Sequence, residues 1–171
     1  MAMNYIYEKI AEKMTGVPHY VPETNAMSWG VDHESEAIER YNEETGNNAT
    51  QMGKTFIEFN DTCGGSPDGF IGDVGIIEVK CPYNSANHIK TYIERDIEKK
   101  YFYQCQGNML FSNRKWCDFV SYDPRMPQNM QIVIIRIIRD DLVCNEIWER
   151  IQSAAEKIIE IQEKTGINLK F

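Results

Sequence analysis

Residues 64–82, which read GGSPDGFIGDVGIIEVKCP, place Asp68, Glu78 and Lys80 in a segment that otherwise has the composition of two apolar strands. Alternate side chains of an extended strand share a face, so GIIEVK directs Glu78 and Lys80 to the same side. The glycines that flank the SPD turn at 66–68 let the chain turn tightly and direct Asp68 toward the same place. The segment therefore predicts two carboxylates and an ammonium group that converge.

Two neighbouring carboxylates are poorly stable away from water unless a positive charge lies between them. Carboxylate oxygens suit a hard cation, Mg²⁺ or Mn²⁺. Such a cation would lower the pKa of a bound water and polarise a phosphoryl oxygen, while Lys80 would hold or deprotonate the attacking water and offset negative charge. The spacing alone equally allows a simpler interpretation, in which Lys80 pairs with Glu78 on a solvated face and Asp68 only shapes its turn.

A third carboxylate lies on the core-facing stripe of a helix predicted for roughly residues 26–44. The stripe recurs at helical spacing and consists of Ala26, Gly30, Glu34, Ile38 and Tyr41. A carboxylate on a core-facing stripe needs a group that stabilises its charge. Glu34 is therefore interpreted either as a ligand linked to the metal through water, or as a carboxylate stabilised by the helix dipole.

The composition of the chain indicates one soluble domain. With 171 residues and 42% hydrophobic side chains, it can form one core of ordinary size, and we expect a single domain over residues 1–171. No apolar run approaches the ~20 residues that cross a bilayer, and no leader-like segment opens the chain, so a cytoplasmic protein is expected. The five cysteines include no Cys-x-x-Cys pair, which argues against a disulfide framework and a zinc or iron–sulfur site.

The order of predicted elements gives an α/β fold (α+β by some schemes). Helices are expected at 3–14, 26–44, 85–112 (one or two helices, capped by Ser85) and 140–165, the last with Leu142 on its buried stripe. Strands are expected at 52–59, 75–80, 116–122 and 130–138. We therefore expect a mixed central sheet flanked by helices.

The formal net charge of −8 is unfavourable for a protein that binds a polyanion. The distribution is uneven, however, because residues 79–116 carry seven basic and three acidic side chains. A phosphate backbone could bind there. A solvated helix face with mixed charges explains the same count, and both interpretations stay open.

Three blocks of sequence together resemble the phage lambda-type alkaline exonuclease family, also called YqaJ-like viral recombinases, within the PD-(D/E)xK nuclease superfamily. The blocks are SWGVDHE (28–34), SPDGF…IIEVKCP (66–82) and KKYFYQCQGNML…WCDFVSYDPRM (99–126), and they occur in the family's order. The resemblance extends from about Tyr5 to the final helix. It implies a core like that of the restriction endonucleases.

The resemblance also implies roles for individual residues. Asp68, Glu78 and the backbone carbonyl of Val79 would hold Mg²⁺, with Glu34 completing the set of ligands through water. Lys80 would be the catalytic lysine.

Further roles follow for the later blocks. Gln104 would orient Lys80 or the nucleophilic water, whereas Gln106, two helical positions on, points elsewhere. A helix hydrogen bond would explain either glutamine equally well. In YDPRM, turn chemistry explains Asp123 and Pro124, and contact of Arg125 with DNA or a neighbouring subunit is the lesser alternative.

Members of this family degrade one strand of duplex DNA from the 5′ end with Mg²⁺, form ring-shaped homotrimers around the duplex, and act with a single-strand annealing protein. These properties are expectations here. An endonuclease or structure-selective nuclease on the same core, and a catalytically silent DNA-binding or scaffold protein, are the alternatives.

One departure from the family pattern concerns the N-terminus. Family members usually begin with a further segment whose arginine binds phosphate near the scissile bond, and from the opening MAMNYIYEK we expect this chain to lack that segment. The possible substitutes are Lys54, Lys90, Arg114 and Lys115, each of which is equally explained as a surface charge.

Overall fold

The computed structural model describes residues 3–52, 56–60 and 63–166. Its helices are α1 (Met3–Thr15), α2 (Asn25–Thr45), α3 (Ser85–Glu94), α4 (Lys99–Ser112), the short 3-10 helix η1 (Gln128–Met130) and α5 (Asp141–Thr165). Its strands are β1 (Ala49–Gln51), β2 (Ile57–Asn60), β3 (Cys63–Gly65), β4 (Gly69–Ile71), β5 (Gly75–Lys80), β6 (Trp116–Tyr122) and β7 (Ile132–Ile138).

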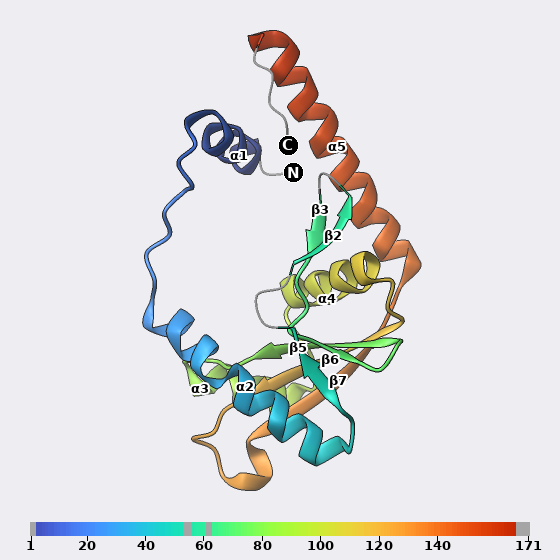
Figure 1. Ribbon diagram of the computed structural model, residues 1–171. Coiled ribbons are helices and arrows are strands. Elements are labelled where there is room, and N and C mark those ends of the chain that lie inside the picture. Colours follow the sequence, from blue (N-terminus) through green and yellow to red (C-terminus); the bar gives the residue numbers. More distant parts are fainter. Residues whose placement is uncertain (1–2, 53–55, 61–62, 167–171) are drawn as a thin grey trace.

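Five strands form one mixed sheet in the order β1-β4-β5-β6-β7, and β2 and β3 form a separate antiparallel hairpin. Strands β5 and β6 run parallel, while the other neighbours in the sheet are antiparallel. Helix α2 covers the face that carries Ile77 and Val79, and α4 covers the face that carries Ile76. Figure 1 shows α5 as a long helix beside α4, with α1 near its far end. The expected mixed sheet flanked by helices is confirmed.

Most element boundaries agree with the sequence patterns, and three predicted details were wrong. Ser85 is the first residue of α3, and the cap is Asn84, whose side chain accepts the Ala86 N–H at 3.0 Å. Leu142 is 81% exposed: it is the second residue of α5, and the buried residue of that helix is Cys144. Of the strand expected at 52–59, residues 57–59 lie in β2, Met52 and Phe56 lie in no strand, and 53–55 lie outside the described residues.

The two halves of helix α2 have different structural roles. The Thr24 side chain accepts the Met27 N–H at its start, and Gly46 closes it in the left-handed region, at φ 68°, where its N–H bonds to the Asn42 carbonyl. Its buried side chains all lie in the second half, at Ala37, Ile38 and Tyr41. The second half therefore anchors the helix on the sheet, and the first half is left to form the wall of a cavity described below.

An ion pair between a buried carboxylate and a half-exposed arginine joins β6 and β7 beneath α2. Asp118 is 2% exposed and accepts two hydrogen bonds of 2.8 Å from Arg136 and one of 2.6 Å from the Tyr41 hydroxyl. Arg136 also lies over the Trp116 ring, 3.8 Å from its centroid. The network ties both strands to the buried half of α2.

Arg136→Gln is expected to lower the free energy of unfolding by about 1–3 kcal/mol, because the buried Asp118 carboxylate loses the hydrogen bonds of the half-exposed Arg136 guanidinium and keeps the one from Tyr41. Urea denaturation measures the change. The control is Arg150→Ala, since the Arg150–Glu146 pair is exposed and is expected to contribute at most ~1 kcal/mol. If both variants lost the same free energy of unfolding, burial of the Asp118 carboxylate would not matter for the strength of its ion pair.

None of the helices within the described ranges combines the length and the apolar character needed to span a membrane.

Candidate active site

A cavity of about 780 Å³ opens at the C-terminal end of β5. One wall is the first half of α2, with Ala26, Met27, Gly30, Val31 and Glu34, and the opposite wall is α3 with the segment that precedes it. Asp68, Val79 and Lys80 lie between the walls. Glu34, Asp68 and Lys80 thus line a cavity that is open to a ligand, while Glu78 lies buried behind Lys80 and does not line it.

The strand alternation places Glu78 and Lys80 on the α4 face of β5, as the sequence predicted. Glu78 is completely buried, and the Lys80 ammonium donates a hydrogen bond to its Oε1. Asp68 is held beside β5 at two points: its N–H donates to the Ile77 carbonyl at 3.2 Å, and its Oδ2 accepts the Val79 N–H at 2.6 Å. The Lys80 ammonium also lies 5.3 Å from the Tyr101 ring centroid.

Asp68, Glu78 and Lys80 together carry more negative than positive charge when both carboxyl groups are ionised. Burial, and then the charge of Glu78, raises the pKa of Asp68 to about 7. Burial also raises the pKa of Glu78, although Lys80 and Asn108 oppose the change. Burial alone would lower the pKa of Lys80, but the charges of Glu78 and Asp68 raise it, so the lysine is an ammonium ion. One ammonium does not balance two carboxylates, and a further cation would stabilise both.

Asn108 of α4 belongs to the same group, and sequence reasoning missed it. It is 6% exposed and donates from Nδ2 to Oε2 of Glu78 at 3.0 Å, so both oxygens of that carboxylate are occupied. Gly65 permits the close approach of β3, because a Cβ there would lie 2.5 Å from Asn108 Oδ1. The available signal was a polar residue among the buried residues 105–109 of a helix, where a side-chain amide needs a partner.

Asn108→Leu is expected to lower the free energy of unfolding by about 1–3 kcal/mol, since one oxygen of buried Glu78 loses its donor. Urea denaturation gives the value. Asn87→Leu, at an exposed position of α3, should stay within about 0.5 kcal/mol of the parent. If Asn108→Leu were as stable as that control, the hydrogen bond to Glu78 would be energetically unimportant.

Glu34 lies on the cavity wall and is half-buried. Its Oε1 accepts a hydrogen bond of 3.0 Å from Gln51 of β1, and its charge contributes to the raised pKa values of Asp68 and Glu78. Glu34 is in the third turn of α2, beyond the first turn where the helix dipole acts. This position weighs against the dipole interpretation, and the water-linked role stays a prediction.

The two glutamines of α4 lie away from the carboxylates. Gln104 is exposed and does not line the cavity, so the structure does not bring it beside Lys80, and its role stays a prediction. Gln106 is fully buried: its Nε2 donates to the Ile138 carbonyl, and its Oε1 accepts the Asp140 N–H, both at 2.9 Å. Gln106 therefore fixes α4 to the turn between β7 and α5.

The candidate phosphate-binding cations are also separated. Lys90 lines the cavity, while Arg114 donates to the Gly72 carbonyl at 2.9 Å and lies over the Phe70 ring. Lys115 is exposed outside the cavity, and Lys54 lies outside the described residues. Lys90 is thus the one of the three described candidates that lies on the cavity wall.

The donor set fits a divalent cation that keeps part of its water. Within residues 3–52, 56–60 and 63–166, no group of three or more His, Cys, Asp or Glu side chains has the arrangement of a metal site. Mg²⁺, however, is usually bound by one or two carboxylates together with water and substrate phosphates. Asp68 and Glu78, whose pKa values are raised by burial, provide such a pair at the end of β5.

Comparisons with known proteins show the family of this chain. A family model described as the YqaJ-like viral recombinase domain matches residues 1–115. A comparison with curated proteins finds no match. The crystal structure of an alkaline exonuclease, LHK-Exo from Laribacter hongkongensis, is 37% identical with a TM-score of 0.86, over 96% of this chain and 82% of that one.

Two further structures are similar. LHK-Exo in complex with dAMP is 36% identical with a TM-score of 0.83, over 96% of this chain and 85% of the other. A phage-related exonuclease from Haemophilus somnus 129PT has a TM-score of 0.79 over 96% and 83% of the two chains, and at 20% identity it bears on the fold alone. The family match and the identity to LHK-Exo place the chain in the YqaJ-like viral recombinase family, with the fold of an alkaline exonuclease.

Proposed function

We propose that this protein is a metal-dependent deoxyribonuclease that degrades duplex DNA from its ends in the 5′-to-3′ direction. The observation that carries the proposal is the group formed by Asp68, Glu78 and Lys80, in which Asp68 and Lys80 line an open cavity and the buried Glu78 carboxylate accepts a hydrogen bond from Lys80. Membership of a viral recombinase family and 37% identity to an alkaline exonuclease support DNA as the substrate.

Asp68, Glu78 and the Val79 carbonyl would hold Mg²⁺, or Mn²⁺ in its place, and Glu34 would act through water. When bound, the cation would neutralise charge on the phosphate and acidify water in the cavity. The carboxylates are suited to this role because their buried charge is only partly balanced by Lys80.

Lys80 would act as an ammonium. Since Glu78 and Asp68 raise its pKa, it would donate hydrogen bonds to the attacking water or to a phosphate oxygen and offset the charge that develops there. A protonated lysine is a poor base, so this assignment favours orientation and charge stabilisation over proton removal. Lys90 is the cavity cation best situated to contact a neighbouring phosphate.

The remaining expectations follow family membership. We infer that three copies enclose the duplex, that the protein acts beside a single-strand annealing protein during phage recombination, and that it does so in the host cytoplasm. A ring would require basic side chains only on its inner surface, which is compatible with the net charge of −8. Light scattering on the purified protein measures the number of copies.

The function is tested by digestion of two substrates, a linear 5′-phosphorylated duplex and a closed circular duplex, with Mg²⁺ and with a chelator. Loss of the linear duplex alone, only with Mg²⁺, is the expected result. Loss of both substrates would indicate an endonuclease, and loss of neither would indicate a DNA-binding protein without catalysis. Labelling the 5′ or the 3′ end gives the direction of degradation.

A further inference from the structure

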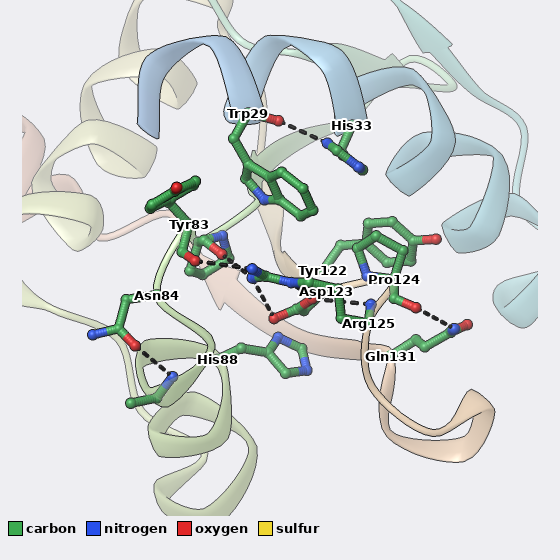
Figure 2. A network of polar contacts seen from close by, with 12 residues as sticks. Trp29, His33, Tyr83, Asn84, His88, Tyr122, Asp123, Pro124, Arg125 and Gln131 are labelled. Atoms are coloured by element: carbon green, nitrogen blue, oxygen red, sulfur yellow. Dashed lines mark hydrogen bonds and ion pairs between the residues drawn. The ribbon is translucent and has the colours of Figure 1, made fainter. Parts of the chain in front are cut away.

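Arg125, in the turn after β6, contacts both elements that form the cavity walls, although neither Arg125 nor its partner Trp29 lines the cavity itself. Its guanidinium carbon lies 4.3 Å from the centroid of the Trp29 ring on α2. On the other side, its Nη1 donates to the Tyr83 carbonyl at 3.1 Å and its Nη2 to the Pro82 carbonyl at 3.0 Å. Figure 2 shows the guanidinium between the Trp29 ring and the backbone that leads into α3.

Asp123 holds this guanidinium in place. Its carboxylate is completely buried and accepts hydrogen bonds of 2.8 Å from Nε and 2.9 Å from Nη2 of Arg125. Burial opposes ionisation of Asp123, but hydrogen bonds from Arg125 and from Ser85, the first residue of α3, lower its pKa. All three guanidinium nitrogens of Arg125 are therefore engaged within the chain, which weighs against the alternative that this arginine contacts DNA.

Apart from the contact between Trp29 and Arg125, few contacts fix the position of the first half of α2, which carries Glu34. Residues 16–24, which lead into α2, are exposed, and the buried side chains of α2 begin only at Ala37. Trp29 is the large aromatic residue of the first half, and its ring stacks on His33 with centroids 3.8 Å apart. The same ring meets Tyr83 edge-on at 6.2 Å. The position of this half of α2 thus depends on what packs against Trp29.

We propose that Arg125 is a positioning residue that sets the width of the cavity. By linking Trp29 to the carbonyls of Pro82 and Tyr83, it fixes the wall that bears Glu34 relative to the wall formed by α3. A guanidinium suits this task because it stacks on an aromatic ring with its plane while its edge donates several hydrogen bonds. The effect on catalysis rests on the proposed nuclease function, whereas the effect on α2 does not.

Arg125→Lys is the main test. Lysine retains a cation near Asp123 but cannot donate to both carbonyls while stacking on Trp29. Hydrogen exchange of the amides of residues 27–34 is expected to become about tenfold faster or more, since this half of α2 opens more easily. The indole N–H resonance of Trp29 should shift. Cleavage of the linear duplex should fall about 10- to 100-fold in kcat, because the wall that bears Glu34 is displaced.

Arg136→Gln is the matched control. Arg136 also forms two hydrogen bonds to a buried aspartate and lies over a tryptophan ring, but neither Asp118 nor Trp116 lines the cavity, whereas Pro82 and Tyr83, which Arg125 contacts, do. At a temperature where both variants are folded by circular dichroism, Arg136→Gln should leave kcat at the parent value, and any faster exchange should be spread over the whole fold rather than concentrated in residues 27–34. An equal effect of both variants would reduce Arg125 to a general contributor to stability and overturn the proposal.

A double-mutant cycle separates positioning from other roles. If Arg125 acts through the wall that bears Glu34, its effect on kcat should largely disappear in a Glu34→Gln background. Fully additive effects would contradict the proposal. If the parent protein cleaves no DNA, the nuclease proposal fails while the exchange experiment still decides the role of Arg125. Unchanged exchange in Arg125→Lys would refute that role even in an active enzyme.

Discussion

Lys80→Ala is expected to lower the rate of cleavage of a linear duplex by about 10³-fold or more, while the fold is retained. The ammonium donates to Glu78 at the cavity and is the charge that would stabilise the developing negative charge of the transition state. Removal of one such preorganised donor typically costs ~10²–10³ in rate, and Lys80 also compensates two carboxylates. Single-turnover digestion with saturating Mg²⁺ measures the chemical step.

The control for this experiment is Lys157→Ala. Lys157 lies on α5, where it pairs with Glu160 at the surface, away from the cavity. This variant should cleave at the parent rate, and circular dichroism should show that both variants are folded. Retained cleavage in Lys80→Ala would remove the lysine from the mechanism.

Asp68→Asn is expected to abolish Mg²⁺-dependent cleavage and yet to stabilise the metal-free protein at pH 8. The amide oxygen can still accept the Val79 N–H, so the turn is preserved. The folded protein raises the pKa of Asp68 from 3.8 to about 7. A carboxyl whose pKa is raised by folding destabilises the folded state once it ionises, and the loss accumulates as pH rises from about 4 to about 7.

The neutral amide removes this loss. The thermal midpoint of Asp68→Asn should therefore exceed that of the parent at pH 8 by a few degrees, which corresponds to about 1–2 kcal/mol, and the difference should shrink toward pH 4. Both proteins are measured with a chelator. Asp73→Asn, at an exposed position of the same segment, serves as the control and should change neither activity nor the midpoint. A less stable Asp68→Asn would show that the carboxylate is satisfied without a metal.

The central part of the fold was predictable because its signals are local. The period of two in GIIEVK and WCDFVSY sets both the extent of β5 and β6 and the face on which Glu78 and Lys80 lie. The helical spacing that includes Glu34 likewise brought a carboxylate to the cavity wall. In each case the side chain faces either a neighbour close in sequence or the core itself, so the pattern of one segment is enough to predict its orientation.

The parts that sequence patterns missed depend on contacts between distant segments. Asn108 meets Glu78 across 30 positions in the sequence. Arg125 bonds to the carbonyls of Pro82 and Tyr83 and stacks on Trp29, which local turn chemistry in YDPRM cannot reveal. Leu142 fits the apolar period of α5 but lies before the helix reaches α4 and is exposed. Periodicity identifies a face of an element, whereas the neighbour of that face is set by the assembled fold.

The most direct test of the account is anomalous diffraction from crystals soaked in Mn²⁺. The account predicts one strong peak at the end of β5, within coordination distance of Asp68 and Glu78 oxygens, at about the 2.1 Å typical of Mg²⁺ sites. The same soak of Asp68→Asn crystals should lose the peak. Soaked crystals of the parent protein with no ion between these two carboxylates, or with an ion bound only elsewhere, would contradict the proposed site.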